Sequence, residues 1–349
     1  KEIFEQPQAL AETLRGHVDM VKSSLSGSMV NPLLPTSSDK IEKIYLIACG
    51  TSWHAALTAK YFLERELQIL VMVEQASEFR YRNPLLDRHT LVVAVSQSGE
   101  TADTLVALRN AKENGAKVLS VTNVVDSSIA RESDAVLYTH AGPEIGVAAT
   151  KTFTAQLVAM RIISLLLHQK TPTWRRDVAE LWNELMEVPA QLERVLRQAE
   201  KIREIALKFS HHQDCLFIGR GPQFPIALEG ALKLKEISYI HAEGYPAGEL
   251  KHGPIALLEK GSPVVAIALA DEYHEKMLSN IQEVLSRQAS VIAIASEGDE
   301  KIRKLAEEVI ELPKLNPSLM PILTAVPLQL LAYFIADHRG HDVDQPRNL

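Results

Sequence analysis

The chain has 349 residues and contains one pattern twice. The sequence IYLIACGTS at residues 44–52 is answered by LFIGRGP at residues 216–222, and LVVAV at residues 91–95 by PVVAI at residues 263–267. The two matches share an offset of 172 residues, and further matches between the halves keep a similar one. Since this period is far longer than that of a solenoid repeat, the sequence predicts a duplicated domain.

Short apolar runs alternate with helical patterns in each copy, which is typical of a parallel sheet flanked by helices. In the first copy the strand candidates are residues 43–48, 69–74, 91–96, 117–122 and 135–138, and the helical patterns are residues 55–67, 101–114 and 150–168. The predicted fold class is therefore α/β, with two similar flavodoxin-like αβα sandwiches. The expected division is residues 1–33 as an N-terminal hinge and helix, 34–174 as the first domain, 175–205 as a helical connector, 206–340 as the second domain and 341–349 as the start of a C-terminal tail.

The net charge and the cysteine content exclude some classes of protein. The net charge of -7 argues against a nucleic-acid partner, which would need a basic face. Cys49 and Cys215 are the two cysteines, so no disulfide framework is expected and a reducing, cytoplasmic location fits. The apolar run at residues 327–336 is too short to span a bilayer, so no membrane association is expected. The chain begins at Lys1 without a Met, which indicates a piece of a longer polypeptide.

The sequence SQSGET at residues 96–101 follows an apolar strand and opens a helical pattern. Such a turn directs unpaired backbone N–H groups and the positive end of a helix dipole at one point. Polar side chains and a glycine that permits close backbone approach add to it: Ser96, Gln97, Ser98, Gly99 and Thr101. A second turn of small residues ends the first strand: Cys49, Gly50, Thr51 and Ser52. Both turns should lie at the carboxyl edge of the sheet, where open α/β sheets bind ligands.

Ordinary helix capping is the alternative explanation for these hydroxyls, because Ser and Thr are common capping residues. Three hydroxyls around one glycine, with a second such turn beside them, favour a phosphate site instead. The counterpart in the second copy, ALADEY at residues 268–273, lacks these hydroxyls and the glycine. The first copy alone is therefore predicted to bind an anion. Neither a P-loop nor a strand-linked G-x-G-x-x-G is present, so nucleotide binding is not supported.

Glu229, Lys233 and Glu236 share one stripe of a predicted helix at residues 227–239. The spacing allows either a solvated ladder of ion pairs or an acid–base site. Residues 241–254 are rich in His, Glu, Gly and Pro without strand or helix period, which predicts a loop with titratable groups. A carboxylate and a histidine suit the proton transfers of a ketose–aldose isomerisation. The histidines lack the spacing of known zinc motifs, so no metal site is predicted.

Seven sequence strings carry a family resemblance: ACGTS at 48–52, ASEFRYR at 76–82, SQSGET at 96–101, GPEIGV at 142–147, LKLKEISYIHAE at 232–243, GELKHGP at 248–254 and DVDQPRNL at 342–349. Over nearly its whole length the chain resembles the isomerase portion of the glucosamine-6-phosphate synthase family, the isomerizing glutamine–fructose-6-phosphate aminotransferases. The first and third strings are shared by sugar-isomerase (SIS) domains at large, and the last three together are specific to the synthases. The resemblance implies two SIS domains.

The resemblance also implies a reaction and partners. Fructose 6-phosphate and glutamine-derived ammonia would be converted to glucosamine 6-phosphate, with glucose 6-phosphate as a related ligand and without a cofactor. An N-terminal glutaminase domain would belong to the same polypeptide, and the enzyme would be a homodimer. Two alternatives stay open: a stand-alone SIS deaminase or isomerase acting on amino-sugar phosphates, and a non-catalytic sugar-phosphate sensor.

The resemblance assigns roles to particular residues. The implied phosphate ligands are Ser52, Ser96, Gln97, Ser98 and Thr101. Glu236 matches the base that moves a proton between C1 and C2, and His252 the ring-opening histidine, which reaches the neighbouring subunit's site in the family. Lys233 matches a lysine beside the sugar hydroxyls, and Val147 a residue that contacts the sugar through its backbone.

The chain departs from the family pattern in two places. Ala149 stands where family members commonly have Ser, so one contact to a sugar hydroxyl is expected to be lost or moved. The family continues past the position of Leu349 with Ala-Lys-Ser-Val-Thr-Val-Glu, whose lysine forms a Schiff base with the keto sugar. The sequence printed here ends before that lysine.

Overall fold

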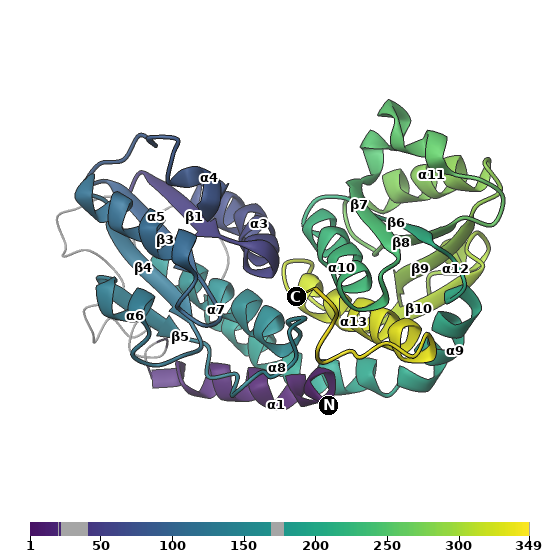
Figure 1. Cartoon of the computed structure of the whole chain (residues 1–349), viewed down its shortest axis with the longest axis horizontal. Coiled ribbons are helices and arrows are strands. Elements are labelled where there is room, and N and C mark those ends of the chain that lie inside the picture. The colour runs from purple at the N-terminus through teal and green to yellow at the C-terminus, as the bar shows by residue number, and fades with distance from the viewer. Residues whose placement is uncertain (20, 22–40, 169–177, 349) are drawn as a thin grey trace. The chain divides into compact units, whose positions relative to one another are not determined.

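The structure is a computed structural model that describes every residue except 20, 22–40, 169–177 and 349. The chain divides into two compact units. Unit 1 consists of Lys1–Pro7, Glu144–Thr150 and Val188–Leu349, and unit 2 of Gln8–Pro143 and Lys151–Glu187. Each unit contains one five-stranded sheet (Figure 1).

The sheet of unit 2 is wholly parallel, with strand order β2-β1-β3-β4-β5. Its strands are β1 (Lys43–Ala48), β2 (Leu70–Gln75), β3 (Thr90–Val95), β4 (Lys117–Thr122) and β5 (Ala135–Tyr138). The predicted strands are confirmed, with shifts of one residue at β2 and β3. Every residue of β3 is buried, as expected for a central strand covered on both faces.

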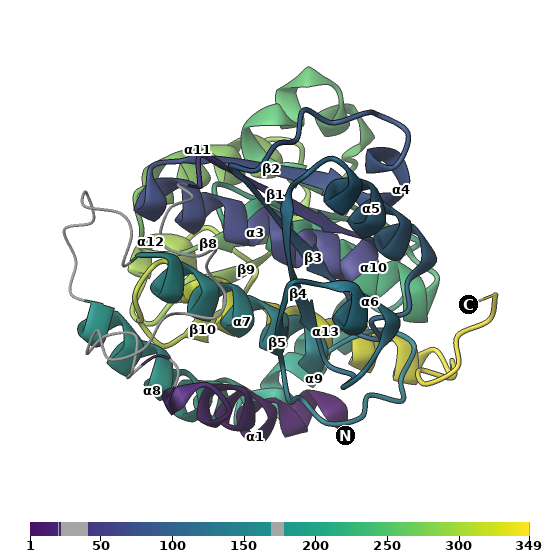
Figure 2. The ribbon, with the colours of Figure 1, turned by 90° about the vertical axis from the view of Figure 1, so that its left-hand side faces the viewer.

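Helices cover both faces of this sheet (Figure 2). They are α3 (Gly50–Leu67), α4 (Ala76–Phe79), α5 (Ala102–Glu113), α6 (Ser128–Glu132) and α7 (Lys151–His168). The helices α3 and α7 pack together on one face, and α4, α5 and α6 lie on the other. Between the second set and the sheet is an apolar core that includes Ile47, Phe79, Val92 and Leu108.

Unit 1 repeats this architecture. Its parallel strands are β6 (Asp214–Gly219), β7 (His241–Pro246), β8 (Pro263–Ala268), β9 (Ser290–Ser296) and β10 (Glu308–Leu312). Their order, β10-β9-β8-β6-β7, is the order of unit 2 read from the opposite edge, with β6 to β10 in place of β1 to β5. The predicted duplication and fold class are therefore confirmed.

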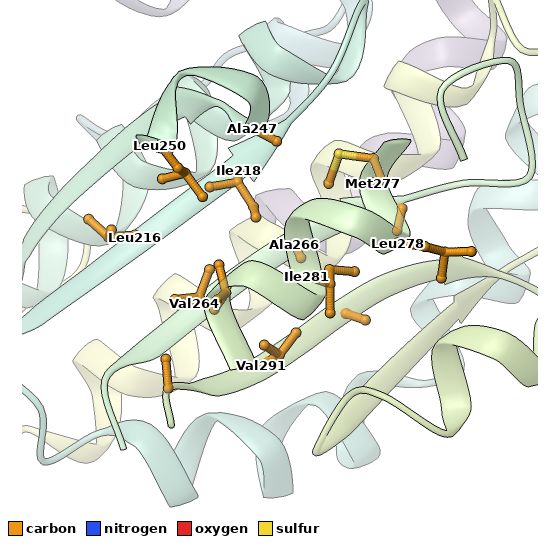
Figure 3. Packing of buried hydrophobic residues seen from close by; sticks show 14 of the residues in the cluster. Leu216, Ile218, Ala247, Leu250, Val264, Ala266, Met277, Leu278, Ile281 and Val291 are labelled. Atoms are coloured by element: carbon orange, nitrogen blue, oxygen red, sulfur yellow. The ribbon is translucent and has the colours of Figure 1, made fainter. Parts of the chain in front are cut away.

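The remaining helices are α1 (Glu2–Arg15), α8 (Val178–Leu196), α9 (Ala199–Phe209), α10 (Gln223–Ser238), α11 (His274–Leu285), α12 (Glu300–Arg303) and α13 (Met320–His338), with the short 3₁₀ helices η1 (Ala247–His252) and η2 (Pro254–Leu257). In unit 1, α13 packs against both α9 and α10. On the other face α11 and η1 cover a core that includes Leu216, Ile218, Val264, Met277 and Ile281 (Figure 3).

The prediction of a loop at residues 241–254 is wrong, because the chain there forms the edge strand β7 and then the 3₁₀ helix η1. The sequence HAEGYP has no clean alternation, since its residues are partly exposed rather than buried on one face. Position 244 requires glycine because the backbone of α10 packs directly against it. A Cβ atom at Gly244 would lie 2.7 Å from the Leu228 Cα, which is too close.

One helix in the described part of the chain, α13, is long and apolar enough to cross a membrane. The apolar run read from the sequence is only its second half, so the length of the helix was underestimated. The apolar window of α13 is 83% buried inside the protein. It therefore serves as a core helix of unit 1.

Candidate active site

Two turns lie side by side at the carboxyl edge of the sheet in unit 2. The neighbouring strands β1 and β3 are in register, with Ala48 opposite Val95. The chain therefore leaves the two strands at adjacent points, through Cys49 and Ser96. The helices α3 and α5 begin just beyond, so their N-termini open at the same edge.

Neither helix is capped by the side chain at its N-cap position. Cys49 precedes α3 and Thr101 precedes α5, and neither side chain accepts a bond from the helix it precedes. The Thr101 hydroxyl is instead hydrogen-bonded to the Ser96 hydroxyl at 2.9 Å. The capping explanation is therefore wrong for this turn, and its helical N–H groups are suited to an anion.

The turn at residues 96–101 is held by its own polar groups. The Ser96 Oγ accepts a hydrogen bond from the Gly99 N–H at 3.1 Å, and the Ser98 Oγ accepts one from the Glu100 N–H at 3.2 Å. The Gln97 carbonyl accepts one from the Asn123 N–H at 3.0 Å. Ser96 is only 2% exposed, whereas Gln97 and Ser98 are partly exposed. Ser96 thus shapes the turn, and its neighbours present polar groups to a ligand.

The second turn is anchored to its surroundings. The Ser52 Oγ accepts a hydrogen bond from the Gln156 Nε2 of α7 at 2.9 Å. The Cys49 Sγ lies 3.9 Å from the Thr104 Oγ1 of α5. Gly50 takes the positive φ of 52°, which favours glycine where the strand turns into the helix. These contacts fix the start of α3 relative to α5 and α7.

Gly99 lets the turn approach the side chains beneath it closely. Its φ is 66°, and a Cβ atom there would lie 2.0 Å from the Ser127 Oγ and 2.8 Å from the Thr122 Oγ1. The close approach is therefore made to neighbouring side chains, and glycine is required for packing the turn.

A Gly99→Ala change is expected to destabilise unit 2 more than a Gly115→Ala change. Both positions have positive φ, which costs an L residue roughly 1–2 kcal/mol. A Cβ at Gly115 meets open space, whereas one at Gly99 overpacks the turn, at a cost of about 1–3 kcal/mol more. Urea unfolding of both variants measures the difference. Equal losses would mean that Ser127 moves aside freely.

In unit 1, side chains of the protein fill the place that corresponds to the two turns of unit 2. A Cβ atom at Gly221, the counterpart of Gly50, would lie 2.4 Å from the ring of Tyr273, so this ring packs on the turn. The Asp271 carboxylate accepts a hydrogen bond from the Tyr273 N–H at 2.8 Å, and burial raises the pKa of Asp271. A phenol ring and a carboxyl group occupy the place where unit 2 presents hydroxyls.

The helix α10 of unit 1 carries a buried cluster of charges. The Lys233 Nζ lies 2.6 Å from the Glu236 Oε2 and 3.5 Å from the Glu229 Oε1. The side chains of Glu229 and Lys233 are 2% and 3% exposed. The solvated ladder that the spacing allowed is therefore wrong, because these two charges lie in the interior.

Electrostatics assign different roles within this cluster. Burial alone would lower the pKa of Lys233, but the charges of Glu229, Glu236 and Glu144 outweigh burial and raise it. The raised pKa favours the protonated, cationic form of Lys233, which suits it to hold a carboxylate. The Glu236 side chain is 21% exposed, although its Oε2, the atom that faces Lys233, is buried. Of the two carboxylates that α10 contributes to the cluster, Glu236 is therefore the more exposed.

Val147 lies in the segment Glu144–Thr150, which belongs to unit 1. It is half-exposed, and its N–H donates a hydrogen bond to the Asp344 carbonyl at 3.3 Å. Ala149 is in the same segment and is partly exposed. Sequence reasoning assigned no role to Glu144, whose charge acts on Lys233, or to Asp344, which holds Val147, because both contacts join residues far apart in the chain.

His252 ends η1 and is exposed. Among the described residues its side chain makes no hydrogen bond, ion pair or ring contact, so the structure does not bring it to the cluster on α10. Across the same described ranges, no group of three or more His, Cys, Asp or Glu side chains is placed to hold a metal ion.

The two units also match a known family in sequence. The sequence profile of the SIS domain matches residues 39–165 and 208–336. The chain belongs to the SIS domain family. Its first SIS domain carries the paired turns, and its second carries the charge cluster.

Relatives of these SIS domains have been named and solved. The chain is 50% identical, over its full length, to a glutamine–fructose-6-phosphate aminotransferase (isomerizing) of Chlorobaculum tepidum, and spans 57% of that protein. It resembles the solved C-terminal domain of glucosamine-fructose-6-phosphate aminotransferase from Francisella tularensis, with 41% identity, a TM-score of 0.87 and coverage of 99% and 97% of the two chains. A glucosamine-6-phosphate deaminase from Thermotoga maritima, at 24% identity, 100% and 97% coverage and a TM-score of 0.79, shares the fold.

Proposed function

We propose that the chain is the sugar-phosphate isomerase part of a glutamine–fructose-6-phosphate aminotransferase. It would convert fructose 6-phosphate and ammonia to glucosamine 6-phosphate. One observation carries this proposal. The same chain contains two adjacent helix N-termini that no N-cap side chain caps, those of α3 and α5, and a carboxylate–lysine–carboxylate cluster on α10. The name of the 50% identical relative supports it.

The first SIS domain would hold the phosphate group. Its partly exposed hydroxyls and amide belong to Gln97, Ser98 and Thr101, with Ser52 in the first turn of α3. The helix N–H groups and both helix dipoles favour a doubly charged anion there. The buried Ser96 would support this site by fixing the turn.

The second SIS domain would carry out the proton transfer. Glu236 would remove a proton from C1 while the C2 carbonyl oxygen gains a proton, which gives an enediol. The same carboxyl group would return its proton to C2 as the C1 hydroxyl loses its proton and C1 becomes the aldehyde carbon. The cation Lys233 would orient Glu236 and contact sugar hydroxyls. Val147 has its N–H engaged, so its carbonyl is the backbone group that remains for a sugar hydroxyl.

Three further parts of the proposal rest on the family. The side chain of His252 is exposed and makes no contact with the described residues of its own chain; it would open the sugar ring in the site of a second copy, which makes the enzyme a homodimer. The remainder of the longer relatives would include a glutaminase domain that supplies ammonia, and a lysine beyond Leu349 would form the Schiff base. No cofactor or metal is required, and a cytoplasmic location is expected.

A non-catalytic sensor of sugar phosphates is the second candidate. It would need the phosphate turns, but it has no use for a buried charge cluster that costs desolvation energy. The decisive test is the interconversion of fructose 6-phosphate and glucose 6-phosphate by the full-length protein. Binding without turnover would identify a sensor.

The double change Ser98→Ala, Thr101→Ala is expected to weaken the affinity for fructose 6-phosphate by at least about 100-fold. Each charge-assisted hydrogen bond contributes roughly 1.5–3 kcal/mol. Calorimetric titration measures the loss. The matched control is Tyr273→Phe, which alters the counterpart of Thr101 in the second SIS domain and should leave the affinity unchanged. An effect of the control as large as that of the double change would place the phosphate in the other domain.

A further inference from the structure

The segment Glu144–Thr150 joins β5 to α7, which are elements of unit 2, yet it is part of unit 1. The Glu2 side chain, in the first turn of α1, binds two of its amides. The Glu2 Oε1 accepts a hydrogen bond from the Ile145 N–H at 2.6 Å, and its Oε2 accepts one from the Gly146 N–H at 3.3 Å. One carboxylate thus holds two successive N–H groups of an exposed segment.

The next amide is held from the other end of the chain. The Val147 N–H donates to the Asp344 carbonyl at 3.3 Å. The packing is close on this side, because a Cβ atom at Gly146 would lie 3.1 Å from the Glu2 Oε2 and 3.8 Å from the Asp344 Oδ1. Glu2 and Asp344 therefore bind the backbone N–H groups of three consecutive residues, 145–147.

Thr150, at the C-terminal end of the segment, is linked to α1 through Gln329 of α13. The Glu144 carboxylate accepts hydrogen bonds from the Thr150 N–H at 2.8 Å and the Thr150 hydroxyl at 3.2 Å. The Thr150 carbonyl accepts one from the Gln329 Nε2 at 3.2 Å, and the Gln329 Oε1 accepts one from the Gln6 Nε2 at 2.9 Å. The first two turns of α1 therefore hold the segment directly through Glu2 and indirectly through Gln6.

The segment is linked to the charge cluster as well. Glu144 is one of the three carboxylates that raise the pKa of Lys233. A shift of the segment would move both this charge and the Val147 carbonyl. An acidic residue in the first turn of a helix also stabilises the helix dipole, and Glu5 does the same in α1. The dipole does not explain two hydrogen bonds to a distant segment.

We propose that Glu2 is a positioning residue for the sugar, acting by holding the segment Glu144–Thr150 in the conformation that contacts the substrate. This inference rests on the proposed function for its substrate, a ketose 6-phosphate. Glu2 itself touches no substrate. Its effect falls on the sugar moiety and not on the phosphate, because the phosphate turns belong to the other unit.

The test compares Glu2→Ala with Glu5→Ala in the full-length protein. Glu5→Ala removes the other acidic residue of the same helical turn and controls for the dipole. For Glu2→Ala we expect a KM for fructose 6-phosphate at least about 10-fold higher with kcat within about threefold, since charge-assisted bonds are lost. The affinity for inorganic phosphate should stay unchanged, and Glu2→Gln, which keeps one acceptor, should lie between.

Amide hydrogen exchange gives a readout that does not depend on activity. The amides of Ile145 and Gly146 should exchange faster in Glu2→Ala than in Glu5→Ala, and this result stands even if the protein proves to be a sensor. Unchanged exchange would overturn the inference. Faster exchange with an unchanged KM, or with unchanged sugar affinity in a sensor, would also overturn it, because the segment would then not position the sugar.

Discussion

Replacing Glu236 with Gln is expected to lower kcat for the interconversion of fructose 6-phosphate and glucose 6-phosphate by about 10²–10⁴-fold. The amide of Gln keeps the size of the side chain but cannot accept the C1 proton. Lys233 still has Glu229 and Glu144 beside it, so the fold should persist. The affinity for fructose 6-phosphate should change little, because the proposed phosphate contacts are in the other domain.

Solvent deuterium incorporation at C1 and C2 measures this step directly. Glu236→Gln should abolish it, and Glu236→Asp should retain a part. A matched control is Glu259→Gln, which neutralises an exposed carboxylate away from α10. If Glu236→Gln exchanges these protons at the rate of the unchanged protein, another group is the base and the assignment fails.

The change Lys233→Met is expected to lower the free energy of unfolding by about 3–5 kcal/mol, the cost of breaking a buried ion pair. It leaves Glu229, which is 2% exposed, without its cation. The matched control is Lys235→Met on the same helix, where the exposed side chain should contribute within about 0.5 kcal/mol. Urea unfolding at several pH values measures both.

The pH dependence gives a second criterion for this variant. Without Lys233, burial should raise the pKa of Glu229 in the folded state above its value in the unfolded chain. The folded protein is then favoured when Glu229 is protonated, so the loss of stability should be small below the unfolded pKa of about 4.3 and grow as the pH rises. A loss that is independent of pH would point to packing as its cause. Lys233→Met, Glu229→Gln should recover part of the stability.

Strand positions could be predicted because the duplicated pattern marks them twice, and runs such as TLVVAV leave little choice for a central parallel strand. The strand β7 escaped prediction because its neighbour α10 dictates Gly244, which reads as a loop residue. The turn at residues 96–101 was recognisable from composition. The packing role of Gly99 was not, since Ser127 approaches it only in the folded chain.

The burial of the charge cluster on α10 could not be predicted from the spacing of its residues either. Residues at i, i+4 and i+7 share one helix face whether that face meets water or protein. Glu2 and Asp344 contact one segment from opposite ends of the chain, and contacts so distant in sequence leave no periodic signal. For the same reason, the sequence could indicate His252 as titratable without showing where it lies.

The contacts of Glu2 and Asp344 with residues 145–147 have a practical consequence for protein engineering. A fragment cut so that it lacks Glu2 or Asp344 would lose one of these contacts, and the segment would then be held from one side only. A kinetic comparison between differently cut fragments would report the position of the cut, so fragments meant for comparison should keep both residues.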